Sequence, residues 1–227
     1  MTTERIIYES FDKSKISALP QVLFDGRIIV VETAESANNC VEYLLQQPIL
    51  GIDTETRPFF KKGFAFKVSL LQISTHEECF LFRLNKMGLP AILCDLLANN
   101  KQLKVGLSLK DDIAALHERA AFVPGKYVDL QNYVVQLGIN DMSLQKLYAN
   151  VFCQRISKSV RLSNWESSVL TEAQKRYAAT DAWACIKLYE ELKRLRKRKD
   201  YQFVRSVNLD VMSDEIIRGL LNELTNK

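Results

Sequence analysis

Residues 49–55 (ILGIDTE) constrain the fold most, because a short apolar run ends directly in two carboxylates. An apolar run of this length is typical of a buried strand. Side chains at positions i and i+2 of a strand point to the same face, so Asp53 and Glu55 present their carboxylates side by side. Two acids at the end of a buried strand repel each other and lose hydration unless a cation joins them. The pair therefore indicates either a metal site or, as the alternative, a solvated strand exit.

Patterns along the rest of the chain predict a mixed sheet covered by helices, because strands come first and then alternate with helices. The β-rich runs predict five further strands, at residues 27–32, 67–75, 79–84, 103–107 and 127–130, the second and third forming a hairpin. Apolar periodicity predicts helices at residues 33–46, 91–99, 110–121, 131–137, 142–152 and 171–198, with a final short helix from Ser213. Thr171 and Gln174 form a capping box that opens the longest helix. We expect an N-terminal arm at 1–26, a main domain at 27–198 and a tail at 199–227.

The composition is that of a globular protein, with 47% hydrophobic and 26% charged residues. The net charge of +4 is compatible with a polyanionic partner. No apolar run approaches the roughly 18 residues that a membrane helix needs, and the charged N-terminus lacks a signal-peptide pattern. Five scattered cysteines without a C-x-x-C pair argue against structural zinc. We expect a reduced, cytoplasmic protein, and the missing P-loop and G-x-G-x-x-G patterns exclude those two nucleotide-binding motifs.

A second acidic position lies in residues 105–112 (VGLSLKDD), where a strand ends and a helix begins. Asp112 borders the apolar stripe of that helix, whereas Asp111 lies toward its polar side. Both acids could simply complement the positive end of the helix dipole. We interpret Asp111 in that way and take Asp112 as the functional candidate.

A third position lies in the long helix, where Tyr177 and Asp181 are four residues apart and share one face. The surrounding residues are apolar, so Asp181 is expected to be buried, and a buried acid requires a partner. A hydrogen bond to a neighbouring loop is the alternative to a functional role.

Taken together, the three positions resemble the ordered motifs of the DEDD superfamily of 3′–5′ exonucleases, in the subgroup with Tyr in the third motif. Within that superfamily the chain more closely resembles ribonuclease D and the exonuclease domain of the Werner syndrome helicase. Three further stretches, at residues 67–73, 143–147 and 158–165, and the run at 170–182 support the resemblance, which covers about residues 27–195. The resemblance implies a ribonuclease H-like α/β fold, with a mixed five-stranded sheet flanked by helices. Residues 27–198 would then be the exonuclease domain.

The resemblance also implies roles for individual residues. Asp53, Glu55 and Asp181 would ligate metal, and Asp112 would hold a second ion directly or through water. Tyr177 would position or help to deprotonate the attacking water. The implied cofactors are two divalent cations, Mg²⁺ or Mn²⁺, which oxygen ligands favour.

Substrate contacts are expected at Thr54, Lys158 and Arg161. Residues 56–66 mix cations with aromatic rings and could grip phosphates and bases, or could pack on the core. The basic run at 193–199 could contact phosphates or be a solvated helix end.

The sequence therefore predicts a metal-dependent 3′–5′ exonuclease whose partner is the 3′ end of DNA or RNA and whose products are nucleoside 5′-monophosphates. The alternative is a catalytically weak nucleic-acid-binding module of the same fold. The set of four acids and one Tyr argues against that alternative, since a binding module gains nothing from a repulsive carboxylate cluster. No membrane association is expected.

Overall fold

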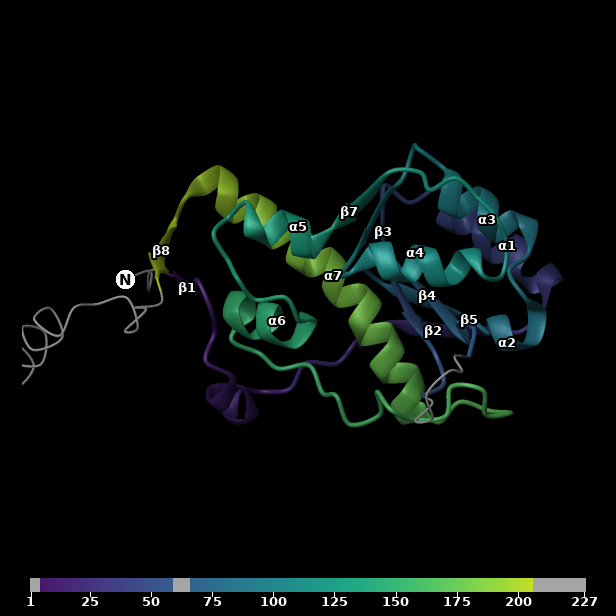
Figure 1. Ribbon diagram of the computed structural model, residues 1–227, viewed down its shortest axis with the longest axis horizontal. Coiled ribbons are helices and arrows are strands. Elements are labelled where there is room, and N and C mark those ends of the chain that lie inside the picture. The colour runs from purple at the N-terminus through teal and green to yellow at the C-terminus, as the bar shows by residue number, and fades with distance from the viewer. Residues whose placement is uncertain (1–4, 59–65, 206–227) are drawn as a thin grey trace, which may run out of the picture.

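The computed structural model describes residues 5–58 and 66–205, in which a central sheet lies between helices on both faces (Figure 1). The strands of this sheet are β2 (Arg27–Val31), β3 (Ile49–Glu55), β4 (Leu70–Ser74), β5 (Glu78–Phe82), β6 (Leu103–Gly106) and β7 (Tyr127–Asp129). The α-helices are α1 (Ala34–Leu44), α2 (Leu84–Met87), α3 (Ala91–Ala98), α4 (Leu109–His117), α5 (Leu130–Val135), α6 (Leu144–Phe152) and α7 (Glu172–Arg198). Two further strands, β1 (Arg5–Tyr8) and β8 (Tyr201–Val204), and the 3₁₀ helix η1 (Lys13–Ala18) lie near the ends of the described chain.

The strand order is β2–β5–β4–β3–β6–β7. Strand β4 runs antiparallel to both of its neighbours, whereas the other adjacent strands are parallel. The predicted mixed α/β fold and the β4–β5 hairpin are confirmed. The resemblance implied five strands, but the sheet has six, because the three-residue strand β7 pairs with β6 at the edge. Residues 127–130 carry the local pattern for that strand.

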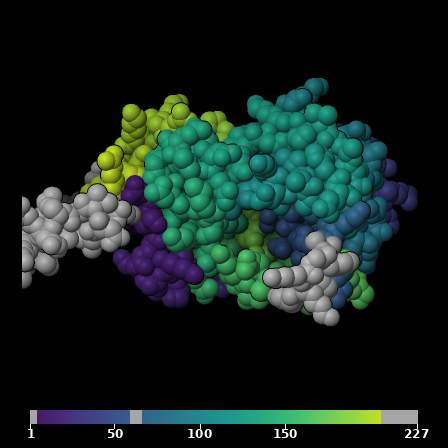
Figure 2. All heavy atoms as spheres, viewed as in Figure 1, coloured from purple at the N-terminus to yellow at the C-terminus, as the bar shows by residue number. Residues whose placement is uncertain are grey.

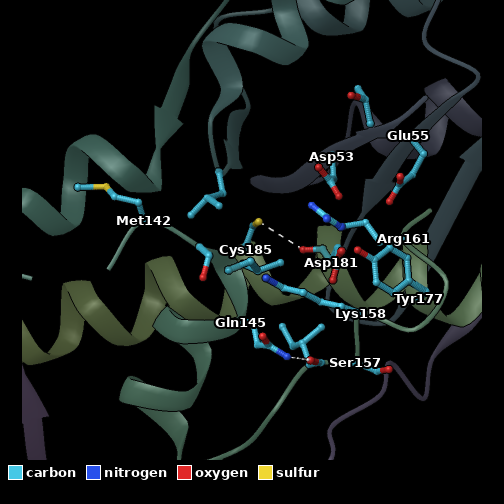
Figure 3. Close-up of a pocket in the computed structure, with 15 residues that line it drawn as sticks. Asp53, Glu55, Met142, Gln145, Ser157, Lys158, Arg161, Tyr177, Asp181 and Cys185 are labelled. Atoms are coloured by element: carbon cyan, nitrogen blue, oxygen red, sulfur yellow. Dashed lines mark hydrogen bonds between the residues drawn. The ribbon is translucent and has the colours of Figure 1, made fainter. Parts of the chain in front are cut away.

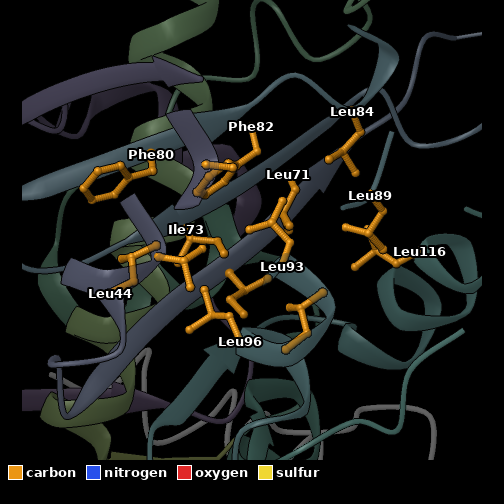
Figure 4. Close-up of a cluster of buried hydrophobic side chains, with 14 of the residues drawn as sticks. Leu44, Leu71, Ile73, Phe80, Phe82, Leu84, Leu89, Leu93, Leu96 and Leu116 are labelled. Atoms are coloured by element: carbon orange, nitrogen blue, oxygen red, sulfur yellow. The ribbon is translucent and has the colours of Figure 1, made fainter. Parts of the chain in front are cut away.

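The face of the sheet opposite α7 packs against α1, α3 and α4 through a cluster of aliphatic and aromatic side chains (Figure 4). Alternate residues of the strands supply it, for example Leu71 and Ile73 of β4 and Phe80 and Phe82 of β5. The period of two leaves Asp53 and Glu55 of β3 on the other face. The hydrophobic core therefore fixes which way these acids point.

Helix α7 covers that other face and contacts five strands of the sheet, most extensively β3. Its capping box is present, with the Thr171 hydroxyl accepting from the Gln174 backbone and the Gln174 side chain accepting from the Thr171 backbone. The residues of α7 that are buried near the sheet include Ala178, Ala179 and Ala182, whose small side chains permit a close approach. The helix thereby brings Tyr177 and Asp181 to the carboxyl end of β3.

The two ends of the described chain meet in a separate two-stranded sheet, in which β1 and β8 pair in parallel. Asn150 of α6 accepts a hydrogen bond from the Tyr8 amide at 2.9 Å and donates one to the Tyr8 carbonyl at 2.7 Å. The described parts of the expected arm and tail therefore pack on the main domain and on each other. The expected helix from Ser213 lies outside the described residues.

None of the helices within residues 5–58 and 66–205 combines the length and the apolar composition that crossing a bilayer requires.

Candidate active site

A cavity of about 310 Å³ opens where the end of β3 meets α7. Its other walls are the N-terminal end of α6 and the loop at residues 156–161. Figure 2 shows this face of the molecule hollowed between the teal and green segments of the chain. All the sequence-predicted site residues except Asp112 line this cavity.

Three carboxylates gather at the floor of the cavity (Figure 3). One oxygen from each of Asp53, Glu55 and Asp181 can be chosen so that all three lie within 4.8 Å of one another. Two come from the strand positions i and i+2, and the third comes from the helix that crosses above them. The structure therefore brings together the three acids that the resemblance implied as metal ligands.

Asp112 lies beside this cluster and not within it. Its carboxylate accepts a hydrogen bond from the Thr54 hydroxyl, so the residue between the two strand acids orients the fourth acid. The neighbouring Asp111 is exposed and accepts from the Ser108 hydroxyl at 3.0 Å. The two acids thus differ in surroundings as the apolar stripe of α4 predicted.

The electrostatics of the cluster oppose four simultaneous negative charges. Burial, followed by the charges of Asp181 and Asp112, raises the pKa of Glu55 to about 9. Burial and the surrounding carboxylates raise the pKa of Asp53 well above its ordinary value. Burial also raises the pKa of Asp181 to about 7 and that of Asp112 to about 6. Each acid therefore holds its proton more tightly here than in water, and a bound cation would remove that tendency.

Two cations of the 156–161 loop face the acids (Figure 3). The charge of Arg161 offsets a small part of the rise in the pKa of Glu55 that burial causes, and the charge of Lys158 does the same for Asp181. Both side chains are exposed to the cavity mouth. Gln145 of α6 donates to the Ile156 carbonyl at 2.8 Å and so holds the start of this loop.

Tyr177 lies one helical turn before Asp181 and lines the same cavity. Burial, followed by the charges of Asp181 and Glu55, raises the pKa of its hydroxyl far above the ordinary value. A hydrogen bond to the Asp181 carboxylate raises the pKa of Tyr177 further and opposes part of the rise in the pKa of Asp181. The phenol therefore stays protonated at neutral pH and acts as a hydrogen-bonding group.

The other predicted substrate contacts lie elsewhere. Residues 59–65 of the aromatic loop are outside the described part of the chain. At its described ends, Arg57 lies 4.8 Å from the Phe66 ring centroid and pairs with Glu166 at 3.3 Å. The basic run at 193–199 is at the far end of α7 from Asp181, where Arg194 pairs with Glu191 and Asp200.

Sequence reasoning assigned no role to several residues of the cavity wall. Met142, Ser143 and Gln145 at the start of α6 line it, as does the buried Cys185, whose thiol donates to the Asp181 carbonyl at 3.3 Å. The Ser143 N-cap was the available signal, because it marks a helix that begins at this point.

The residues present fit a divalent metal ion. The Asp181 Oδ1 atom is buried and has no hydrogen-bond partner among the residues that the structure describes. An orphaned carboxylate oxygen is costly, whereas a cation among three carboxylates would satisfy it. Hard oxygen donors suit Mg²⁺ or Mn²⁺. The cluster is therefore chemically suited to binding a divalent metal ion.

The chain is similar to several known proteins. The sequence profile of the 3′–5′ exonuclease family matches residues 28–196. A 3′–5′ exonuclease of Arabidopsis thaliana is 29% identical over 212 residues, which cover 85% of this chain and 73% of the relative. The bifunctional 3′–5′ exonuclease/ATP-dependent helicase WRN of Mus musculus is 30% identical over 184 residues, covering 77% of this chain and 13% of the relative.

Among solved structures, RNase D of Escherichia coli, an exoribonuclease involved in structured RNA processing, has a TM-score of 0.65. It is 19% identical, and the match covers 77% of this chain and 47% of that one. At this identity the likeness shows a shared fold.

Proposed function

Because the chain belongs to the 3′–5′ exonuclease family, we propose that its carboxylate cavity hydrolyses the terminal phosphodiester bond of DNA or RNA and releases nucleoside 5′-monophosphates. The observation that carries this proposal is the convergence of Asp53, Glu55 and Asp181 at the floor of an open cavity whose wall carries Tyr177. Carboxylates without a cation would make this cavity repel a phosphate. The cluster is thus consistent with a metal-dependent phosphodiesterase.

Two divalent cations, Mg²⁺ or Mn²⁺, complete the proposed site. Asp53, Glu55 and Asp181 would hold the first ion, and Asp112 would hold the second directly or through water. Such ions would lower the pKa of the attacking water and neutralise the charge that develops on the phosphate. Thr54 contributes by fixing the Asp112 carboxylate through its hydroxyl.

The protein's own side chains do the rest. Tyr177 remains protonated, so its hydroxyl orients the attacking water by hydrogen bonding and does not act as the base. Lys158 and Arg161, which face the acids from the 156–161 loop, can bind the phosphate oxygens of the terminal nucleotides. The open cavity mouth admits a chain end.

A degradation assay tests this function. We expect 5′-labelled single-stranded DNA, 3′-recessed duplex DNA or single-stranded RNA to shorten one nucleotide at a time with Mg²⁺ or Mn²⁺, and to stay intact with EDTA. Asp111→Asn is the matched control for Asp112→Asn, because both change an acid at the start of α4 but only Asp112 contacts Thr54. Binding of all three substrates without shortening in either metal would contradict the proposal and favour a binding module.

A further inference from the structure

Gln72 of β4 is a buried polar residue that the proposed mechanism does not use. Its side chain lies at 0% exposure. Within residues 5–58 and 66–205, neither its Nε2 nor its Oε1 atom has a hydrogen-bond partner. A carboxamide left unpaired in the interior destabilises the fold, and an apolar side chain of similar size would avoid that penalty. Packing of the core therefore does not explain why this position carries a glutamine.

The register of the sheet places Gln72 directly opposite Asp53 of β3. Residues opposite each other on antiparallel strands point to the same face, with Cβ atoms about 4.5–5.5 Å apart. On the other side Gln72 is opposite Leu81 of β5, which packs in an apolar cluster with Leu70 and Ala178. Of its two cross-strand neighbours, only Asp53 offers a hydrogen-bonding group.

The next polar side chain on the same face of β4 already has a partner. The Ser74 hydroxyl, two residues along β4 on the same face, donates to the Thr75 carbonyl at 2.8 Å. Glu55, the other acid of β3 on this face, is opposite Leu70 and not Gln72. The length of a glutamine side chain suffices to span from β4 to the Asp53 carboxylate.

We propose that Gln72 is a positioning residue for Asp53, whose ionised carboxylate accepts a hydrogen bond from the Gln72 Nε2 group and is thereby held in the orientation that binds a divalent cation. This inference rests on the proposed metal-dependent function. Carboxylates that ligate metal ions are themselves held by hydrogen bonds, and loss of such a partner typically weakens metal binding about 10–100-fold. The free-energy cost of burying the Gln72 amide is then offset because the amide orders the Asp53 carboxylate as a metal ligand.

The test compares Gln72→Met with the wild-type chain in two measurements. Isothermal titration with Mn²⁺ gives the dissociation constant, and thermal melting in EDTA gives the stability without metal. We expect the Mn²⁺ dissociation constant to rise about tenfold or more. We expect the melting temperature in EDTA to stay equal or to rise, because the unpaired amide is gone. A merely structural role would not weaken Mn²⁺ binding while the metal-free protein stays as stable as wild type or becomes more stable.

Two further variants keep the result interpretable. Ile73→Val changes the next residue, which points to the opposite face of the sheet, and should lower the melting temperature while leaving Mn²⁺ affinity unchanged. Gln72→Leu removes the amide with a different shape, so an equal loss of Mn²⁺ affinity assigns the effect to the amide.

The outcomes separate this inference from the proposed function. If both Gln72 variants bind Mn²⁺ within twofold of wild type, the positioning role is overturned, whereas exonuclease activity of the wild-type chain with Mn²⁺ still supports the function. If the wild-type chain binds Mn²⁺ and the variants lose affinity, but no substrate is degraded, the positioning role stands and the function does not. A wild-type chain that binds no Mn²⁺ overturns both.

Discussion

Gly51 of β3 lies directly beneath the Ala182 carbonyl of α7, so closely that a Cβ atom at Gly51 would stand 2.0 Å from that oxygen. Atoms cannot approach to that distance, so only glycine permits this contact. Gly51 is two residues before Asp53, and Ala182 follows Asp181. The missing side chain at Gly51 is therefore what lets α7 lie near enough for the helix acid to meet the strand acids.

The first prediction follows from this contact. In Gly51→Ala the added methyl group must push α7 away from β3, because the clashing atom belongs to the backbone. We expect a loss of about 1–3 kcal/mol of stability, as overpacking in a core typically causes, and a melting temperature lower by roughly 2–4 °C per kcal/mol. Mn²⁺ affinity should fall as well, since Asp181 moves away from Asp53.

The melting temperature and the Mn²⁺ affinity of Gly51→Ala together test this prediction. Gly88→Ala is the comparison for the added methyl, because a Cβ there meets nothing within 4 Å, although its positive φ of 71° adds local strain. Unchanged Mn²⁺ affinity in Gly51→Ala would show that the metal site does not depend on this contact.

The second prediction concerns the carboxylates themselves. Asp53→Asn removes a carboxyl group whose ionised form is disfavoured by burial and by the neighbouring carboxylates, so the protein in EDTA should melt at a higher temperature than wild type. The same variant loses a metal ligand, and exonuclease activity should fall by orders of magnitude. Melting curves in EDTA and a degradation assay with Mn²⁺ measure the two effects. A variant that is less stable in EDTA, or that retains wild-type activity, contradicts this account.

Most of the fold could be predicted from local patterns. The apolar run before Asp53 and the capping box at Thr171 are contained within a few neighbouring residues, and both predicted the observed elements. The pairing of β1 with β8 could not be predicted, because each strand has only four residues and the two are almost the whole chain apart. Strands of that length acquire their identity from the partner and not from their own periodicity.

The candidate site likewise combines features that the sequence predicts with features that it does not. The sequence separates Asp112 from Asp111 by their position on a helix face, and the structure places them differently. That Thr54 would bind the Asp112 carboxylate, or that Gln72 would lie opposite Asp53, depends on strand register and on the packing of α4 against the sheet. These are relationships between distant segments, which no local pattern encodes.

The third prediction is a pH dependence of stability without metal. Asp181 and Glu55 hold protons more tightly in the folded chain, with pKa values of about 7 and 9, than in the unfolded chain. The folded state therefore binds more protons between about pH 4 and pH 9, and stability falls as the pH rises through that range. We expect the melting temperature in EDTA to be higher at pH 5 than at pH 8. Glu55→Gln should make this decline shallower, whereas a melting temperature that rises from pH 5 to pH 8 would contradict the prediction.

The fourth prediction separates Tyr177 from the acids. Tyr177→Phe removes one hydrogen-bonding group and leaves every carboxylate in place, so activity should fall about 10²–10³-fold. Asp181→Asn should instead weaken Mn²⁺ binding as well as the rate. Rates measured against Mn²⁺ concentration distinguish the two, because saturating metal should partly restore Asp181→Asn and leave Tyr177→Phe unchanged. Wild-type activity in Tyr177→Phe would reduce the phenol to a packing role.

The last prediction concerns Arg83, whose side chain is fully buried. It links Ser167, in the segment between the 156–161 loop and α7, to the end of β5. Its guanidinium donates to the Ser167 carbonyl and pairs with Glu32 at 3.4 Å. The neighbouring Lys86 also pairs with Glu32 and donates to the Ser168 carbonyl, but it is partly exposed.

Arg83→Met removes the donor to the Ser167 carbonyl and loosens the segment that joins the 156–161 loop to α7, at a cost of about 1–3 kcal/mol. Because Lys158 and Arg161 of that loop are proposed to bind substrate phosphates and not the metal, we expect KM for a labelled oligonucleotide to rise several-fold while kcat and Mn²⁺ affinity change little. Lys86→Met should have a smaller effect, since its contact is closer to solvent. A fall in kcat at unchanged KM would instead mean that Arg83 supports the carboxylate cluster.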